Sequence, residues 1–271
     1  MSVKIFFTDL DGTLLTDEKK VSPATYAMLD RWTHGGNKLV LCSGRALDSI
    51  SHVRESLQLT FPNMYLIGCN GGEILDCTSG EILTRLTLSL DTVLGAFRLA
   101  KEYDIYLQTY SQTHILTPRV GAELEYYRQI IHTPYLCREE IGDLLAEEPC
   151  KCLAIELKDP GKLERFRQAV AKHFEKELTV LYSNPQYLEL FPCESGKGRG
   201  VRWLCNHLGI ELSNALAAGD EINDISMLEA AGLGIAMKNG REEVKKSADA
   251  ITSADNNHDG LVSFLEQAML P

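Results

Sequence analysis

Short apolar runs of strand length alternate with helical patterns at both ends of this chain, and this alternation limits the fold more than any other feature. Near the start, such runs cover residues 3–7, 38–42 and 64–68. Towards the end, they cover residues 188–191, 215–219 and 233–236. Strands separated by helices pair in parallel, and the helices then cover both faces of the sheet. The two ends of the chain therefore predict one shared core with a parallel sheet.

The middle of the chain has a different pattern. From about residue 89 to residue 183 the predicted strands are short and half-polar, and helices lie between them. Such strands are typical of an antiparallel sheet with one face open to solvent. We therefore expect a separate α+β domain, inserted into the core as a segment of roughly 100 residues.

Composition and charge exclude several classes of protein. Hydrophobic residues make up 44% of the chain, as in ordinary globular proteins. Lys and Arg total 27 against 38 Asp and Glu, and the resulting net charge of −11 disfavours binding to nucleic acid. The sequence contains no run of 18 apolar residues and no signal-peptide pattern, so we expect no membrane partner and a cytoplasmic location.

The eight cysteines do not predict a zinc site or a disulfide framework. None of them forms a Cys-x-x-Cys pair, and several lie inside apolar runs. We expect reduced thiols that pack as small apolar groups.

Two carboxylates follow the first predicted strand directly. Asp9 and Asp11 flank Leu10 at its end. Functional groups in open α/β sheets lie just beyond the carboxyl ends of strands, and residues two apart in an extended strand end point the same way. We therefore expect both carboxylates to face one pocket, where their repulsion favours a hard cation such as Mg²⁺. The alternative is an acidic turn that bonds its own backbone.

A second pair of carboxylates follows another predicted strand. Asp220 and Asp224 are four residues apart, in a loop that enters a helix. With the first pair they would complete a coordination shell around one cation. Taken alone, the segment is more typical of a helix N-terminus with acidic residues in its first turn.

A hydroxyl group and a lysine occupy two further strand ends. Ser43 and Gly44 follow the second predicted strand, where a hydroxyl and backbone N–H groups at a helix start form a site for anions. Lys197 lies in a glycine-rich turn that matches neither the phosphate-binding loop nor the dinucleotide-binding fingerprint. The alternatives are that Ser43 only caps a helix and that Lys197 is solvated.

Together the four segments predict more than each does alone. Two carboxylate pairs, a hydroxyl and a lysine all fall at strand ends of one sheet. This set suits covalent phosphoryl transfer, in which one Asp attacks phosphorus and a second Asp handles the proton. A lysine and Mg²⁺ would neutralise the phosphoryl oxygens.

These motifs resemble those of the haloacid dehalogenase superfamily, and specifically of its Cof-type sugar-phosphatase branch. The resemblance covers nearly the whole chain and rests on segments 9–15, 43–45, 70–71, 197–198, 219–224 and 259–260. It implies an α/β fold whose doubly wound, parallel-sheet (Rossmann-like) core covers residues 1–84 and 185–271. An inserted α+β cap domain would cover residues 85–184.

The resemblance also implies chemical roles for the acidic residues. Asp9 would be the nucleophile and form an aspartyl-phosphate. Asp11 would protonate the leaving oxygen and then activate water. The cofactor would be Mg²⁺, held by Asp9, the backbone carbonyl of Asp11, Asp220 and Asp224.

Other loops would hold the phosphoryl group. The phosphate-binding residues implied by the resemblance are Leu10 (through its backbone N–H), Ser43, Gly44, Lys197 and Asn223. The cap is expected to set specificity. Its candidate pocket residues, for which ordinary packing is the alternative, are Tyr106, Tyr110, His114 and Tyr126.

The function expected from these roles is that of a Mg²⁺-dependent phosphatase for small phosphorylated metabolites, with sugar phosphates as the first class to consider. We expect a monomer or a small homo-oligomer. Two alternatives are a sugar phosphomutase and a receiver-like signalling module that accepts a phosphoryl group.

Overall fold

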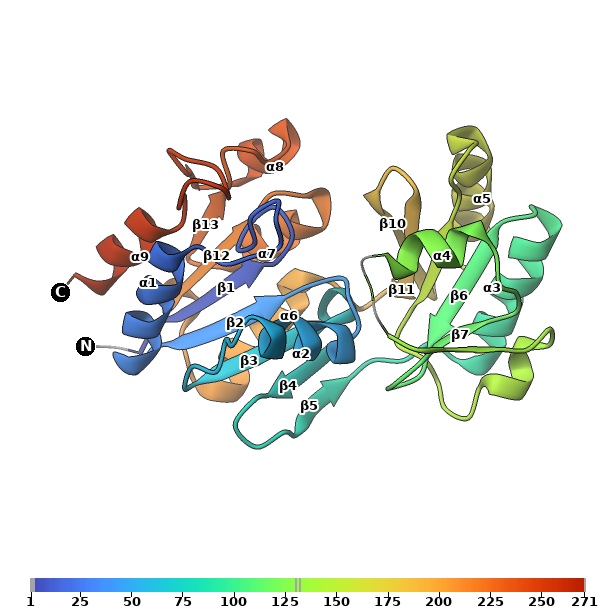
Figure 1. Cartoon of the computed structure of the whole chain (residues 1–271), viewed down its shortest axis with the longest axis horizontal. Helices are drawn as coiled ribbons and strands as arrows, with labels where there is room; N and C mark the ends of the chain where they lie inside the picture. Colours follow the sequence, from blue (N-terminus) through green and yellow to red (C-terminus); the bar gives the residue numbers. More distant parts are fainter. Residues whose placement is uncertain (1–2, 130, 132, 271) are drawn as a thin grey trace. The chain divides into compact units, whose positions relative to one another are not determined.

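The computed structural model describes residues 3–129, 131 and 133–270 and divides the chain into two units (Figure 1). The first, the core unit, consists of Met1–Ser43, Ile50–Thr84 and Gly196–Pro271. The second, the cap unit, consists of Gly44–Ser49 and Arg85–Ser195. As expected, the core unit is built from both ends of the chain.

An eight-stranded sheet lies at the centre of the core unit in the described part of the chain. From edge to edge its strands are β14 (Ala250–Ile251), β13 (Leu233–Ala236), β12 (Ala215–Gly219), β1 (Ile5–Asp9), β2 (Lys38–Cys42), β3 (Met64–Gly68), β4 (Glu73–Asp76) and β5 (Ile82–Arg85). The strands from β14 to β3 are parallel, and β4 is antiparallel to β3. The expected parallel-sheet core is confirmed.

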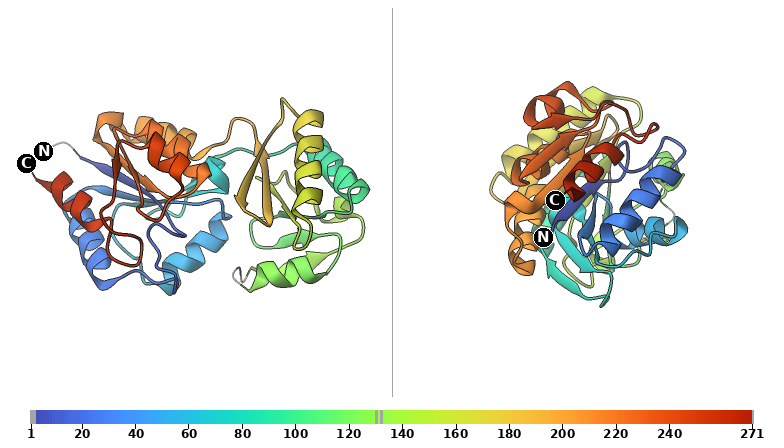
Figure 2. Two further views of the ribbon diagram at one scale, coloured as in Figure 1. Left: turned by 90° about the horizontal axis from the view of Figure 1, so that it is seen from above. Right: turned by 90° about the vertical axis from the view of Figure 1, so that its left-hand side faces the viewer.

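Helices cover both faces of the core sheet. They are α1 (Pro23–His34), α2 (Leu47–Ser56), α6 (Lys197–Leu208), α7 (Ile225–Ala230), α8 (Glu242–Ser247) and α9 (Val262–Met269). Ile5 and Phe7 of β1 belong to an apolar cluster with residues of α6 and α7, whereas Phe6 contacts Trp32 of α1 at a ring-centroid distance of 6.3 Å. Successive strand side chains point to opposite faces, so β1 is buried on both. α1 and α9, from distant parts of the chain, lie side by side (Figure 2).

The carboxyl ends of β1 and β12 are neighbours in the middle of this sheet. β1 pairs with β2 on one side and with β12 on the other. The chain runs outwards from β1 to β3 and later returns to β12, so the strand order reverses between β1 and β12. Doubly wound sheets bind ligands where the order reverses. Asp9 ends β1 and Asp220 follows β12, so both aspartates lie at this point.

The cap unit contains a six-stranded sheet within the described residues. In order, its strands are β10 (Leu178–Asn184), β11 (Tyr187–Pro192), β9 (Cys152–Ile155), β6 (Tyr106–Tyr110), β7 (Ile115–Thr117) and β8 (Tyr135–Cys137). Its helices are α3 (Leu90–Glu102), α4 (Ala122–Arg128) and α5 (Pro160–His173). All strand pairs are antiparallel except β7 and β8, which are parallel. The expected α+β architecture is confirmed.

Two expectations about the cap are wrong. The strand predicted at 188–191 was expected in the core, but the structure places it as β11 in the cap sheet. The reason is a tight turn after Asn184, which joins β10 and β11 as an antiparallel hairpin. The cap sheet is also not open on one face, because α3 and α5 pack on one side and Leu124 and Tyr127 of α4 pack on the other.

No helix in the described ranges combines the length and the apolar character needed to cross a membrane. All eight cysteines are free thiols, as expected. Five of them are buried, where a thiol packs as a small apolar group.

Candidate active site

Three carboxylates form a group at the ends of β1 and β12. Asp9 is the last residue of β1, Asp220 follows β12, and Asp224 ends a short helix, η4 (Ile222–Asp224). One carboxylate oxygen from each of the three lies within 4.8 Å of the other two. The structure thus brings together three of the four acidic residues that the sequence singles out, although 211 positions separate Asp9 from Asp220.

Lys197 lies against two of these carboxylates and is fully buried, so the alternative of a solvated lysine is wrong. Its ammonium group donates to Asp9 Oδ1 at 2.6 Å and to Asp224 Oδ1 at 2.5 Å. The next residue must be glycine, because a Cβ atom at Gly198 would lie 2.1 Å from the carbonyl oxygen of Ser226. Burial by itself lowers the pKa of Lys197, but the charges of Asp224 and Asp9 outweigh it and raise that pKa above its ordinary value.

Further hydrogen-bond donors hold Asp224 and Asp220. Asp224 Oδ2 accepts the backbone N–H groups of Asp220 and Glu221, each at 3.0 Å. The hydroxyl of Thr13 donates to Asp220 Oδ1 at 2.7 Å. No role is predicted for Thr13 from its residue type alone, although it lies in the same short segment as Asp9. This hydrogen bond from Thr13 therefore links the loop after β1 to the loop after β12.

Gly12 allows these two loops to approach each other. Its φ of +85° lies in the left-handed region, and a Cβ atom there would be 2.4 Å from Asp220 Oδ2. The side-chain amide of Asn239 donates to the carbonyl of Gly12 at 2.7 Å. A side chain at position 12 would displace the Asp220 carboxylate, so glycine is required there by space as well as by backbone conformation.

The group carries more negative charge than Lys197 balances. Burial raises the pKa of Asp9 well above its ordinary value; Lys197 opposes this rise, and Asp224 and Asp220 add to it. Burial also raises the pKa of Asp220 to about 7, although a hydrogen bond from Thr13 opposes the shift. Clustered oxygen donors that lack positive charge fit a hard divalent cation.

The metal-free protein is expected to lose stability as the pH rises towards 7. The folded-state pKa of Asp220 is about 7 and its ordinary value is 3.8, so between these values the folded state holds a proton that the unfolded state has lost. The free energy of unfolding therefore falls as pH increases across this window. Thermal denaturation in chelator between pH 5 and pH 8 measures the effect, and the variant Asp220→Asn, which lacks the titrating group, is the reference. A wild-type Tm that runs parallel to that of the variant across this range would contradict the shift.

Asp11 does not join the carboxylate group among the described residues. Its side chain pairs with Lys19 Nζ at 2.7 Å and is 38% exposed. The expectation that Asp9 and Asp11 face one pocket assumed an extended strand end. β1 ends at Asp9, and the N–H of Leu15 bonds back to the carbonyl of Leu10 at 2.8 Å, so the alternation of side chains stops there.

The residues implied to bind phosphate lie in loops around the same sheet edge. Ser43 follows β2 and is buried, and Gly44 continues its loop. Leu10 is fully buried beside the acidic segment. The Asn223 amide donates to Asn70 Oδ1 at 3.0 Å, and the N–H of Asn70 donates to the carbonyl of Ser43 at 3.1 Å. Asn70 therefore connects two of the predicted phosphate-binding residues.

Two of the four candidate pocket residues of the cap are packed inside it. Tyr106 and Tyr110 are buried, and the amide of Gln108 joins their hydroxyl groups through hydrogen bonds of 3.0 and 2.7 Å. His114 is half-buried and Tyr126 is exposed.

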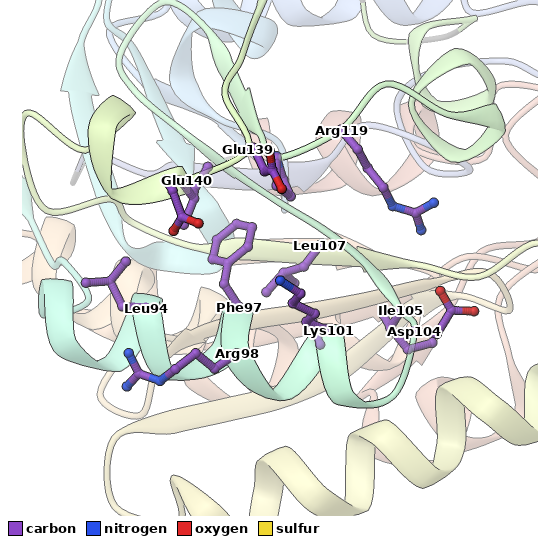
Figure 3. Close-up of a pocket in the computed structure, with 13 residues that line it drawn as sticks. Leu94, Phe97, Arg98, Lys101, Asp104, Ile105, Leu107, Arg119, Glu139 and Glu140 are labelled. Carbon is purple, nitrogen blue, oxygen red and sulfur yellow. The ribbon is translucent and has the colours of Figure 1, made fainter.

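A separate cavity of about 510 Å³ lies within the cap unit (Figure 3). Phe97 and Leu107 supply apolar wall, and Lys101 and Glu140 are among its charged residues. Asp9, Asp220 and Asp224 do not line it. The carboxylate group therefore lies apart from this cavity, in the core unit.

A doubly wound core with a carboxylate group and a buried lysine at its strand-order reversal, interrupted by a cap, defines a class of capped α/β hydrolases. The sequence profile of the family described as haloacid dehalogenase-like hydrolase matches residues 6–265. The chain belongs to this family.

Curated relatives and solved structures match the chain over almost its full length. It is 28% identical to the 5-amino-6-(5-phospho-D-ribitylamino)uracil phosphatase YwtE of Bacillus subtilis over 98% of both chains. It is 27% identical to phosphatase YwpJ of the same organism, over 94% of this chain and 96% of the relative. A crystal structure of a haloacid dehalogenase-like hydrolase from Bacteroides thetaiotaomicron is 28% identical, with a TM-score of 0.89 over 98% of this chain and 99% of that one. The protein is an enzyme and belongs with the phosphatases of its family.

Proposed function

We propose that this protein is a Mg²⁺-dependent phosphatase that hydrolyses small phosphorylated metabolites through an aspartyl-phosphate on Asp9. One observation carries the proposal: Asp9 contacts the buried ammonium of Lys197 and lies in one group with Asp220 and Asp224. A nucleophilic carboxylate, a cation beside it and further oxygen donors are the parts that phosphoryl transfer through an enzyme-bound intermediate needs.

Asp9, Asp220 and Asp224 would hold the metal, with the backbone carbonyl of Asp11. The raised pKa values of Asp9 and Asp220 support a bound cation, because the metal-free group is short of positive charge. An all-oxygen donor set favours Mg²⁺ over softer metals. When bound, Mg²⁺ neutralises charge on the phosphoryl oxygens.

In the first step, an oxygen of Asp9 bonds to phosphorus while the bond from phosphorus to the leaving oxygen breaks. Asp11, which takes up a proton from solvent once it separates from Lys19, gives that proton to the leaving oxygen, so the leaving group departs as a neutral alcohol. Lys197 balances the charge of Asp9. The groups that would hold the phosphoryl oxygens are the N–H groups of Leu10 and Gly44 and the side chains of Ser43, Lys197 and Asn223.

In the second step, water attacks the phosphorus of the aspartyl-phosphate and Asp11 accepts a proton from that water. The bond to Asp9 breaks, inorganic phosphate is released and the carboxylate is restored. Asp11 must leave Lys19 to reach the substrate. Both side chains are well exposed, at 38% and 52%, and such pairs contribute at most about 1 kcal/mol, so the rotation is inexpensive.

Phosphorylated sugars and sugar alcohols are the substrate class we propose to test first. The substrate that gives YwtE its name carries a phosphate on a ribityl group. The present protein aligns with 98% of YwtE. A screen of phosphorylated metabolites with Mg²⁺, repeated in chelator, should show metal-dependent release of inorganic phosphate. Isomerisation of a hexose phosphate without phosphate release would identify a phosphomutase, and a phosphoprotein that lasts for minutes would identify a receiver-like module.

Asp11→Asn is expected to lower kcat by about 10²- to 10⁴-fold, because the amide neither donates nor accepts the proton. Steady-state hydrolysis of an alkyl phosphate measures the loss. An aryl phosphate, whose leaving group needs less protonation, should lose less in the first step. Asp17→Asn, at an exposed aspartate of the same loop, is the matched control and should keep wild-type activity. Equal activity of the two variants would exclude Asp11 as the acid and base.

A further inference from the structure

A turn of three residues after β3 has no role in the chemistry described above. This turn, η1 (Cys69–Gly71), has positive φ at every residue: 50° at Cys69, 51° at Asn70 and 89° at Gly71. L residues other than glycine rarely adopt this region, and two in succession need surroundings that hold them there. Cys69 and Asn70 are almost completely buried, so packing supplies such surroundings.

Asn70 is bonded through both its backbone and its side chain. Its N–H donates to the carbonyl of Ser43 at 3.1 Å, and its Oδ1 accepts from Asn223 Nδ2 at 3.0 Å. The left-handed conformation lets one residue serve the loop after β2 and the loop after β12 together. A side-chain amide has two N–H bonds, so Asn223 keeps a second one for another acceptor.

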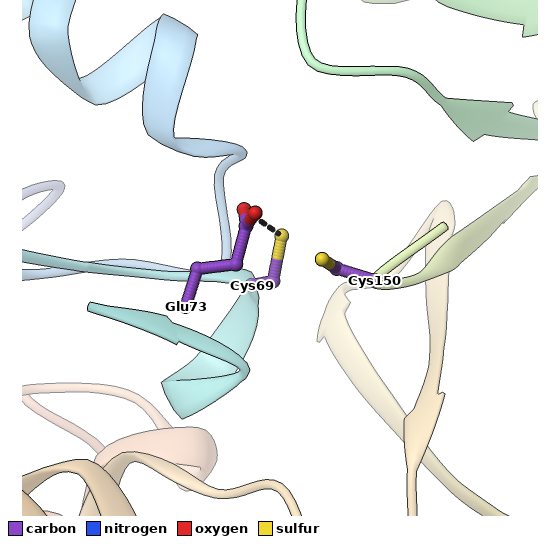
Figure 4. A group of neighbouring side chains, drawn as sticks. All are labelled: Cys69, Glu73 and Cys150. Carbon is purple, nitrogen blue, oxygen red and sulfur yellow. Dashed lines mark hydrogen bonds between the residues drawn. The ribbon is translucent and has the colours of Figure 1, made fainter. Parts of the chain in front are cut away.

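Cys69 and Gly71, on either side of Asn70, hold the turn in place. A Cβ atom at Gly71 would lie 2.1 Å from the carbonyl oxygen of Gly196, the residue before Lys197, and Arg199 donates to the carbonyl of Gly71 at 3.0 Å. The Cys69 thiol donates to Glu73 Oε2 at 3.5 Å (Figure 4). The turn therefore touches the loop that carries Lys197 as well.

We infer that Asn70 is a positioning residue for phosphate binding, acting through Asn223. Because Asn70 presents an oxygen, Asn223 must direct its NH₂ group towards Asn70, and its second N–H is then held in place for a phosphoryl oxygen. Without this acceptor the amide can turn over and present its own carbonyl oxygen, which repels an anion. The inference rests on the proposed function, because only there does Asn223 bind phosphate.

Asn70→Gly tests the side chain without disturbing the turn. Glycine adopts positive φ freely and keeps the N–H bonded to Ser43, so only the carboxamide is lost. We expect KM for a phosphorylated substrate and the inhibition constant of inorganic phosphate to rise about 3- to 10-fold, the effect of one hydrogen bond. The value of kcat should change by less than about twofold, because the groups that react are untouched.

Asn63→Gly is the matched control. Asn63 is another left-handed asparagine, with φ of 61°, and it directly precedes β3, whereas Asn70 follows it. Its side chain accepts from Lys38 at 2.9 Å and donates to the carbonyl of Thr33. Loss of Asn63 is expected to lower Tm with no change in KM, which separates positioning from general stability.

A double-mutant cycle with Asn223→Ala tests whether Asn70 acts through Asn223. If Asn70 acts through Asn223, Asn70→Gly should have no further effect on KM in the Asn223→Ala background. Unchanged KM and unchanged phosphate inhibition in Asn70→Gly would overturn the inference while leaving the phosphatase intact. A wild-type protein that releases no phosphate from any substrate would instead overturn the proposed function. If Asn70→Gly does not fold, the test is the KM of Asn223→Ala. A KM equal to that of the wild type would overturn the inference, because Asn223 would then not bind phosphate.

Discussion

Asp9→Asn is expected to lower kcat by at least about 10⁴-fold, as loss of a nucleophile does in other covalent mechanisms. An amide nitrogen or oxygen does not form the acyl phosphate bond that the carboxylate forms. The fold should be at least as stable as the wild type, because burial raises the pKa of Asp9 and the neutral amide removes a charge that is unfavourable there. Activity and Tm are therefore expected to move in opposite directions.

Steady-state kinetics and thermal denaturation measure both effects on one preparation. Acid-quenched wild-type protein with substrate should carry a covalent phosphoryl group by intact mass, and the variant should not. Slow deamidation of the introduced asparagine would restore wild-type protein, so the residual activity must be compared with the fraction of deamidated chain. Substantial turnover that this fraction does not explain would exclude Asp9 as the nucleophile.

The core could be predicted because its signals are local. A buried strand such as β3 is an unbroken apolar run, and parallel strands with helices between them have few ways to assemble. The convergence of Asp9 and Asp220 follows from the same rule, because each residue lies at the carboxyl end of a strand of one sheet. The core sheet and the nearness of Asp9 and Asp220 both follow from the order of strands and helices, without side-chain contacts.

The assignment of β11 to a sheet could not be made in this way. Its residues, Tyr187–Pro192, are apolar enough for either sheet. The choice depends on pairing with β10 across a short turn and with β9 more than 30 residues earlier. Such pairing is a tertiary property, since the same run fits any sheet that offers a free edge.

The details of the site depend on backbone geometry that periodicity does not describe. Asp11 pairs with Lys19 and is not in the group of Asp9, Asp220 and Asp224, because the chain curls after β1. Asn70-Gly71 has the local signature of a left-handed turn, but the partner of its side chain, Asn223, lies 153 positions away. A residue that acts by contact with a distant loop carries no signal in its own segment beyond its unusual conformation.

Lys197→Ala is expected to remove both activity and a large part of the stability. Lys197 is fully buried between Asp9 and Asp224, and without it two buried carboxylates lose their cation. Breaking a buried pair from one side costs about 3–5 kcal/mol. For a chain of this size that corresponds to a fall in Tm of about 10 °C. Because the pKa of Lys197 is raised above its ordinary value, the wild-type lysine stays charged between pH 5 and pH 9, so loss of its own proton does not change its contribution there.

The pattern of rescue distinguishes this loss from simple damage to a core. Asp9→Asn in the Lys197→Ala background removes one unpaired carboxylate and should recover part of the Tm. Mg²⁺ should recover part of it as well, because the cation replaces the missing positive charge. Lys151→Ala is the matched control: Lys151 is a buried lysine of the cap unit, 2.7 Å from Glu189, outside the carboxylate group. Lys151→Ala keeps the carboxylate group intact, so Mg²⁺ should raise its Tm only as much as it raises that of the wild type, whereas the rise in Lys197→Ala should be larger. An equal rise in the wild type and in both variants would show that the cation does not replace the charge of Lys197.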